Sequence, residues 1–224
     1  MELPKNLKIT LNYFNILEKQ FDIDKIINVY FYGSYLYGTF NKKSDYDYIA
    51  IYDQDIDVSD TIKIDFPVKM NITLMSPKYF KKRIKNHNID VLECIFTDDK
   101  YKLEQIKFDF KLNKDKLRRS ISAVCSNSYV KCKKKLVQGD DYIGKKSLFH
   151  SLRIADYGIQ IAKNSKIVSF DNCYSETLKD YKTFKNLFDE IMTFNTWNEL
   201  NEKYKHIANN IRTEFRKYAP LNNE

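Results

Sequence analysis

Two carboxylates separated by one residue, Asp45 and Asp47, are the residues of this chain best suited to metal chemistry. The stretch from Asp45 to Tyr52 has the composition of a β-strand, and side chains on a strand alternate between its faces, so both carboxylates should project from one face. Two carboxylates this close repel each other unless a cation lies between them. Hard oxygen ligands in this arrangement favour Mg²⁺, or the similar ion Mn²⁺, which also binds substrate phosphates.

A glycine and a serine precede this pair. Gly33-Ser34 follows Ile27 to Tyr32, a β-branched and aromatic run that predicts a buried strand. We expect the strand to run into the start of a short helix at Gly33-Ser34, where free backbone N–H groups and the helix dipole favour an anion. Gly33 would let a phosphate approach the backbone closely. A phosphate site beside a carboxylate pair predicts Mg²⁺-dependent phosphoryl or nucleotidyl transfer.

The longer motif resembles the signature of the DNA polymerase β-like nucleotidyltransferase superfamily. It consists of Gly33-Ser34, Gly38-Thr39 and Ser44-Asp45-Tyr46-Asp47, which reads Gly-Ser-x-x-x-Gly-Thr-x-x-x-x-Ser-Asp-x-Asp. The resemblance implies that Asp45 and Asp47 hold the metal ion. It also implies nucleotide-binding roles for the small residues of the motif, which are Gly33, Ser34, Thr39 and Ser44. A surface turn followed by an acidic strand is the competing interpretation, but it leaves the joint occurrence of both half-motifs at this spacing without a reason.

In this superfamily a third carboxylate usually lies on a strand just before a helix that begins Ser/Thr-Pro-x-x-Phe. Residues 76–80 match that helix start, with Ser76 as the N-cap and Pro77 at the first helical position. Counting back five positions, the expected carboxylate falls on Asn71, whose neutral amide is a poorer metal ligand and no general base. Three outcomes are open: one metal ion suffices, Asp65 replaces the missing carboxylate, or the site binds nucleotide without turnover.

A second candidate group lies on a helix predicted over residues 145–163. Lys146, His150, Arg153 and Tyr157 are spaced so that they share one helix face. A similar Lys…His-x-x-Arg helix occurs in a subgroup of uncharacterised bacterial and phage-type nucleotidyltransferases. That resemblance implies that Lys146, His150 and Arg153 bind the phosphates of the nucleotide. Without it, a polar helix edge with one structural histidine is the simpler interpretation.

The surrounding elements predict an α+β protein. We expect a small mixed-sheet domain of the nucleotidyltransferase type over residues 1–110 and a helical bundle that binds substrate or nucleotide over residues 111–224. The expected strands are 27–32, 45–52, 61–66 and 68–75, and the expected helices are 6–22, 78–88, 114–138, 145–163, 175–190 and 196–218. We also expect His87 to be exposed near the end of its helix, and Glu93 to be a buried structural residue.

Charge is spread unevenly along the chain. Residues 1–110 contain 16 basic and 17 acidic side chains, whereas residues 111–224 contain 22 and 13. This asymmetry favours a C-terminal half that holds a polyanion, RNA or tRNA, for the N-terminal half to act on. A solvated basic helical face explains the same surplus equally well.

The sequence contains no recognisable membrane, signal-peptide or redox motif. No run of 18 apolar residues and no signal-peptide pattern occurs, which predicts a soluble cytoplasmic protein with no membrane partner. The subgroup resemblance leaves a phage or viral origin open. None of the four cysteines forms a Cys-x-x-Cys pair, so free thiols are expected instead of a zinc or redox site.

The function predicted is Mg²⁺- or Mn²⁺-dependent transfer of a nucleoside monophosphate from an NTP, expected to be ATP, to a hydroxyl acceptor such as RNA or tRNA. The alternative is a weakened module of the same fold that binds nucleotide or RNA without turnover, and Asn71 is the residue that favours it. A third possibility is one half of a toxin–antitoxin pair or an AMP-transferase that modifies a protein.

Overall fold

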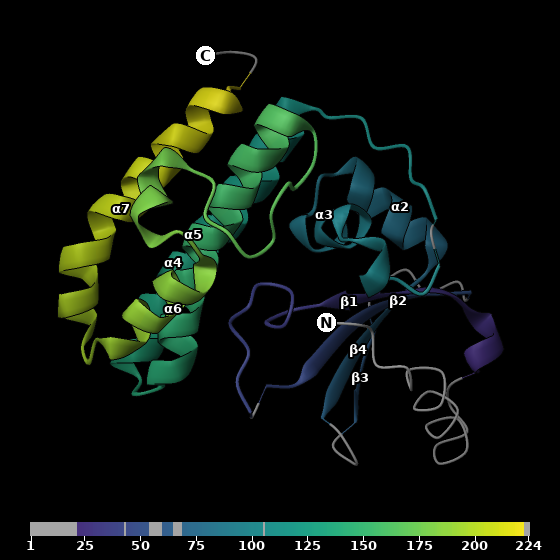
Figure 1. Cartoon of the computed structure of the whole chain (residues 1–224), viewed down its shortest axis with the longest axis horizontal. Coiled ribbons are helices and arrows are strands. Elements are labelled where there is room, and N and C mark those ends of the chain that lie inside the picture. The colour runs from purple at the N-terminus through teal and green to yellow at the C-terminus, as the bar shows by residue number, and fades with distance from the viewer. Residues whose placement is uncertain (1–21, 43, 54–59, 65–68, 105, 222–224) are drawn as a thin grey trace. The chain divides into compact units, whose positions relative to one another are not determined.

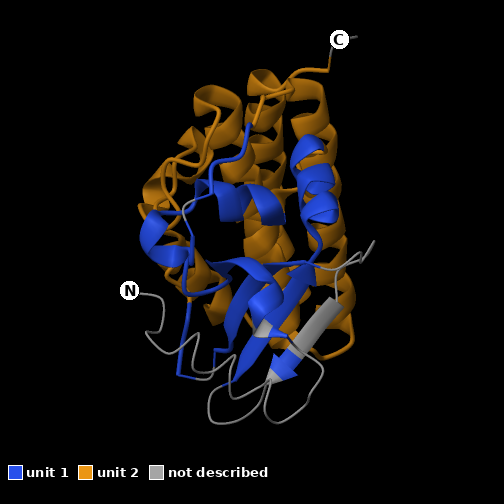
Figure 2. Cartoon of the chain, turned by 90° about the vertical axis from the view of Figure 1, so that its right-hand side faces the viewer, with its two compact units in different colours: residues 1–36, 40–85, 90–109 blue, residues 37–39, 86–89, 110–224 orange. Residues whose placement is uncertain are grey.

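The computed structural model describes residues 22–42, 44–53, 60–64, 69–104 and 106–221 (Figure 1). The helix expected over residues 6–22 therefore lies outside the described residues, except for its last position. Asp65 also lies outside them. Contacts within the chain group it into two compact units (Figure 2). The sheet unit comprises residues 1–36, 40–85 and 90–109, and the helical unit comprises residues 37–39, 86–89 and 110–224.

The sheet unit is built on a four-stranded mixed sheet with strand order β1-β2-β4-β3. The strands are β1 (Ile26–Tyr32), β2 (Tyr46–Tyr52), β3 (Asp60–Ile64) and β4 (Met70–Met75). β2 pairs antiparallel with β1 and parallel with β4, and β3 pairs antiparallel with β4. The register places Asp47 between Tyr32 on β1 and Asn71 on β4. The small mixed sheet expected from the sequence is thus confirmed.

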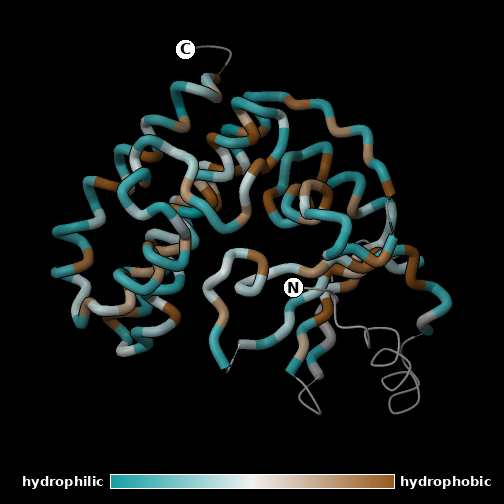
Figure 3. The backbone as a smooth tube through the Cα atoms, viewed as in Figure 1, coloured by the Kyte–Doolittle hydropathy of each residue, from teal (hydrophilic) through white to brown (hydrophobic). Residues whose placement is uncertain are grey.

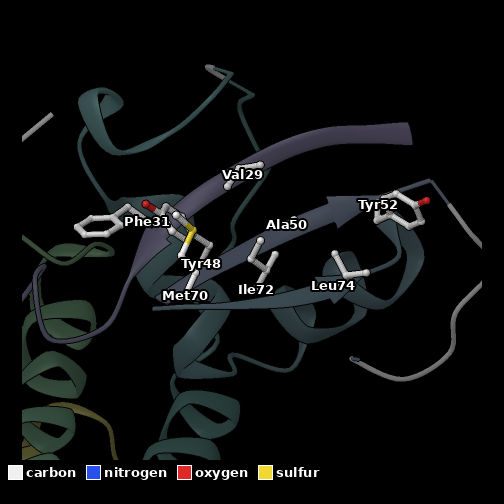
Figure 4. Packing of buried hydrophobic residues seen from close by; sticks show 8 residues of the cluster. All are labelled: Val29, Phe31, Tyr48, Ala50, Tyr52, Met70, Ile72 and Leu74. Carbon is white, nitrogen blue, oxygen red and sulfur yellow. The ribbon is translucent and has the colours of Figure 1, made fainter. Parts of the chain in front are cut away.

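The strands carry apolar side chains on both faces. On one face lies a buried cluster from three strands (Figure 4), formed by Val29, Phe31, Tyr48, Ala50, Tyr52, Met70, Ile72 and Leu74. Tyr30, which points away from Phe31, stacks at 5.6 Å on Phe80 of α2 (Pro77–Lys85). Figure 1 shows α2 and α3 (Ile89–Phe96) lying over one face of the sheet. Burial on both faces explains why β1 and β2 read as nearly continuous apolar runs.

The helix after β4 begins as its sequence predicts. The Ser76 hydroxyl accepts a hydrogen bond from the Tyr79 amide at 3.1 Å, and Pro77 takes the first helical position. Two short 3₁₀ helices also belong to this unit: η1 (Ile23–Lys25) and η2 (Asp99–Tyr101). Glu93 is fully buried on α3, as expected for a structural residue.

The prediction that His87 is exposed is wrong. Its side chain is only 2% exposed, and its backbone takes a left-handed conformation with φ of 57° just after α2 ends. In that conformation the ring accepts a hydrogen bond through Nε2 from the Asn113 amide, at 2.9 Å. Asn113 is in turn the N-cap of the next helix, so His87 fixes a helix start. No local pattern around His87 indicates this partner, because Asn113 lies 26 residues further along the chain.

The helical unit contains four α-helices among its described residues. They are α4 (Lys114–Val137), α5 (Asp141–Asn164), α6 (Phe184–Thr193) and α7 (Trp197–Tyr218), with the 3₁₀ helix η3 (Glu176–Tyr181) before α6. Asn113, Thr183 and Thr196 each cap a helix by accepting a hydrogen bond from an amide three residues on. Figure 3 shows hydrophilic and hydrophobic residues alternating along these helices. The expected C-terminal helical bundle is confirmed.

Two boundaries differ from expectation. The turn expected over residues 139–144 is shorter, because α5 already begins at Asp141. The single helix expected over residues 175–190 is divided, because Lys182 takes a φ of 55° and Thr183 caps a new helix. No helix in the described part of the chain is long and apolar enough to cross a membrane.

Candidate nucleotide and metal site

Asp45 and Asp47 lie on the same side of the sheet and converge on Asn71. The Asn71 amide nitrogen donates hydrogen bonds to Asp45 Oδ2 at 3.3 Å and to Asp47 Oδ1 at 2.9 Å. β2 and β4 run parallel, with Asp47 and Asn71 as direct neighbours, so the strand register itself produces this contact. All three side chains are half-buried, which leaves them accessible to a ligand. Strand alternation thus predicted the relation between the two carboxylates correctly.

Gly33 lies in contact with one member of this pair, Asp47. Its φ of 85° is in the left-handed region, and a Cβ atom placed on it would overlap the Asp47 carboxylate. Only glycine satisfies both conditions, because it has no side chain and adopts positive φ without strain. Gly33 and Asp47 are therefore direct neighbours within the sheet unit.

The residues after Gly33 form turns, and the helix start expected there is not observed. Ser34 to Gly38 are in turn conformation, with one backbone bond from the Leu36 amide to the Gly33 carbonyl at 2.9 Å. Gly38 has a φ of 73°, so two left-handed glycines enclose only four residues. That length is too short for a ladder of i to i−4 hydrogen bonds. Any anion held at this site must therefore be bound without a helix dipole.

Ser44 shapes the entry to β2. Its hydroxyl accepts a hydrogen bond from the Asn41 amide at 2.9 Å, and its own amide donates to the Asn41 carbonyl at 3.0 Å. This closed turn fixes the chain immediately before Asp45. Thr39, another residue of the motif, is buried and groups with the helical unit.

An aromatic stack accompanies the acidic pair and was not anticipated. The Tyr35 ring lies between Phe40 at 4.4 Å and Tyr46 at 4.6 Å, nearly parallel to both. Burial, the hydrogen bond with Tyr46 and the nearby charges of Tyr46 and Asp45 raise the pKa of Tyr35 to about 12. Its phenol is therefore protonated at neutral pH. The alternation that turns Asp45 and Asp47 one way also turns Tyr46 the other, which is the sequence signal that could have indicated this stack.

The donor set fits a divalent cation bound through oxygen. Among the described residues no group of three or more His, Cys, Asp or Glu side chains forms, at this site or elsewhere, so Asp45 and Asp47 are a pair without a third acidic ligand. The hydrogens of the Asn71 amide point between the two carboxylates, where positive charge is electrostatically favoured. Rotation of that amide would present its oxygen instead and add a third hard ligand.

The face of α5 that was predicted to bind phosphate is largely enclosed within the helical unit. Arg153 is only 1% exposed, and its guanidinium lies 3.6 Å from the centre of the Tyr37 ring and 4.7 Å from that of Tyr157. One guanidinium nitrogen, Nη2, lies 3.4 Å from His150 Nδ1. The four residues therefore do share a face, but the Tyr37 ring covers Arg153 on it.

His150 lies in a cationic environment. Burial, followed by the positive charges of Arg153, Lys146 and Lys131, lowers the pKa of His150 well below its usual value. Lys131 belongs to α4, and no spacing rule within α5 could have placed it beside His150. Lys146 is half-buried and so stays partly accessible on this face.

Comparison with known proteins bears on the sheet unit. Residues 13–113 match the family described as "Nucleotidyltransferase domain", a range that contains Gly33-Ser34, the acidic pair and Asn71. The resemblance stated from the motif is thereby confirmed. No curated protein matches the chain. Among solved structures, the chain is similar to a nucleotidyltransferase-like protein from Exiguobacterium sibiricum 255-15, with 9% identity, a TM-score of 0.32 and coverage of 94% of this chain and 76% of that one.

Proposed function

We propose that this chain, whose residues 13–113 match the nucleotidyltransferase domain, transfers a nucleoside monophosphate from an NTP to a hydroxyl acceptor. The observation that carries the proposal is the convergence of Asp45 and Asp47 on Asn71, directly beside Gly33. A pair of carboxylates next to a side-chain-free stretch of backbone suits a substrate that brings phosphates and a divalent cation together.

Asp45 and Asp47 would hold Mg²⁺ or Mn²⁺, with Asn71 as a third ligand after rotation of its amide. Bound there, the ion would stabilise the negative charge that develops on the triphosphate during transfer. Gly33 and Ser34 would admit the phosphates to the backbone, and Ser44 would keep the turn before Asp45 closed. Asp65 remains a proposed source of the third carboxylate.

The helical unit is proposed to contribute phosphate binding. Lys146 is the accessible cation on the α5 face, and a lysine ammonium binds phosphate as a point charge. Arg153 and His150 would stabilise the structure of that face through their contacts with the Tyr37 ring. RNA or tRNA is the proposed acceptor, supported by the positive balance of residues 111–224.

The test is incorporation of label from α-³²P NTPs into total RNA. The purified full chain is incubated with each NTP in turn, with Mg²⁺ or with Mn²⁺, and products are separated by denaturing electrophoresis. We expect labelled RNA and released pyrophosphate, with ATP as the preferred donor. The absence of product from every NTP with either metal, while nucleotide still binds, would overturn the proposed transfer.

A second candidate function is nucleotide or RNA binding without turnover. Asn71 favours it, because an uncharged amide that donates hydrogen bonds to both carboxylates takes the position where a superfamily enzyme has its third acidic group. Calorimetry with ATP, in the presence and absence of Mg²⁺, separates the two candidates when paired with a pyrophosphate assay. Binding without pyrophosphate release supports the module, and release supports the enzyme.

A further inference from the structure

A cavity of about 390 Å³ lies beside α2 in the sheet unit, apart from the acidic pair. Its walls are α2 and the chain segment of residues 106–109. Three lysines line it, Lys81, Lys85 and Lys107, together with the apolar side chains of Ile84 and Phe108. The cavity thus combines positive charge with an apolar floor, a combination that suits an anion carrying a flat apolar group.

The positive charge at this cavity is weakly balanced. α2 has the sequence PKYFKKRIK, with five cations and no carboxylate. Arg83 is neutralised by Asp90 on α3, at 2.6 Å. Within the described residues, by contrast, no carboxylate lies within 4.0 Å of the ammonium groups of Lys81 or Lys107. Asp109 is the one acidic side chain that lines the cavity.

The apolar floor of the cavity is packed against the buried core of the sheet unit. The Phe108 ring packs on Phe80 at 5.3 Å, and Phe80 is fully buried between α2 and the sheet. Ile84, one turn further along α2, is also buried. Phe108 itself is half-buried, so its ring is held by Phe80 while part of it lines the cavity.

We propose that this cavity and the lysines of α2 bind a single-stranded nucleic acid, with a base against Phe108 and phosphates at Lys81 and Lys107. Basic grooves with a stacking aromatic are the usual means of holding an unpaired strand. A strand fits better than a nucleoside monophosphate because Lys78 and Lys85 continue the row along about 10 Å of helix, further than a single phosphate reaches. The proposal rests on the proposed function in that this strand would be the acceptor.

The test measures binding of a fluorescein-labelled, unstructured RNA 12-mer to the full chain by anisotropy over a range of salt concentrations. Replacing both lysines, Lys81→Ala with Lys107→Ala, should weaken binding at least about tenfold and reduce the slope of log affinity against log salt by about 1.4. The matched control removes two exposed lysines of the sheet unit that do not line the cavity, Lys25→Ala with Lys100→Ala, and should change affinity less than twofold. Equal losses in the two double variants would overturn the proposal.

Phe108→Leu tests the stacking component. Leucine keeps apolar contact with Phe80 but lacks an aromatic face, so affinity for the 12-mer should fall about tenfold while the salt slope is unchanged. Thermal unfolding of the variant shows whether the segment is still packed. A folded variant with unchanged affinity would overturn the role of Phe108, and unlabelled ATP that displaces the 12-mer at equimolar concentration would identify a mononucleotide site instead.

The same samples separate this proposal from the proposed function. Incorporation of α-labelled NTP into the 12-mer is measured in parallel with binding. Suppose that the cavity variants lose binding but neither they nor the parent incorporate label. The proposed binding site is then supported, and the proposed transferase activity is overturned. If the parent incorporates label and the cavity variants bind the 12-mer as tightly as the parent, the proposed binding site is overturned and the proposed transferase activity is supported.

Discussion

The two units of this protein each bring together charged residues whose spacing suggested a site, yet they place them in different environments. In the sheet unit, Asp45 and Asp47 lie half-buried at the start of a strand, with room for a ligand. In the helical unit, Arg153 is almost fully buried between two tyrosine rings. Spacing alone determines which residues share a face, whereas exposure depends on what packs against that face. The acidic pair is therefore the better candidate for direct contact with substrate.

The largest effect is expected from removing the acidic pair. Asp45→Ala combined with Asp47→Ala should lower nucleotide incorporation by at least about 10³-fold, because charge stabilisation of the transferring group is lost. The change should leave thermal stability nearly intact, since the two carboxylates repel each other in the absence of a cation. Single-turnover incorporation of α-labelled NTP measures the first effect, and calorimetric unfolding measures the second.

A carboxylate at the other end of the same strand provides the control. Asp53 follows β2 and is exposed, so Asp53→Ala removes a negative charge without touching Asn71. We expect its incorporation rate to stay within twofold of the parent. If Asp53→Ala were as inactive as the double variant, net charge and not the paired geometry would be responsible.

The next largest effect is expected on the stability of the folded protein, from replacing Arg153. Arg153→Ala removes a buried side chain from between Tyr37 and Tyr157, and we expect a loss of about 3 kcal/mol in the free energy of unfolding. Lys146→Ala, on the same face but half-buried, should change it by less than about 0.5 kcal/mol. Urea unfolding of both variants checks the contrast. A stable Arg153→Ala variant with a raised KM for ATP would show that Arg153 acts on substrate directly.

Asn71→Asp should increase the affinity of the acidic site for a divalent cation. A third carboxylate beside Asp45 and Asp47 adds negative charge where an uncharged amide now donates hydrogen bonds, so the Mg²⁺ concentration for half-maximal binding should fall about tenfold. Titration calorimetry with Mg²⁺ or Mn²⁺ measures this directly. Asn71→Ala is the companion variant, and it should weaken metal binding. Identical metal titrations for all three proteins would mean that Asn71 does not face the ion.

The smallest effect is a pH dependence in the helical unit. The folded protein holds the pKa of His150 below its unfolded value, because of burial and the cations Arg153, Lys146 and Lys131. As the pH falls through the unfolded pKa of about 6.5, the unfolded chain takes up a proton that the folded chain does not, so stability declines. Thermal midpoints between pH 7.5 and 5.5 should decrease by a few degrees more for the parent than for His150→Gln. Parallel curves for the two proteins would contradict the lowered pKa.

Much of the fold follows from local sequence chemistry. The alternation at Asp45-Tyr46-Asp47, the cap at Ser76-Pro77 and the bounds of α4 depend on residues within a few positions of one another, and all were predictable. The turns after Gly33 were not, because two glycines in left-handed conformation ended the segment before a helix could form.

The remaining surprises come from contacts distant in sequence. His87 is buried by its bond to Asn113, and Lys131 reaches His150 from a different helix. Arg153 is enclosed because α5 packs against several helices and receives Tyr37 on one face. Helical periodicity identifies such a face but contains no information on its partner.

The grouping of residues 37–39 and 86–89 with the helical unit has an evolutionary consequence. A recombination event near residue 110 would inherit the Tyr37 ring without Arg153, or Arg153 without its ring, and would likewise separate His87 from Asn113. Seven residues that lie early in the chain thus belong to the architecture of its later part. We therefore expect the two units to have been passed on together, with changes at Tyr37 and Arg153 compensating one another, and not to have been exchanged as independent modules.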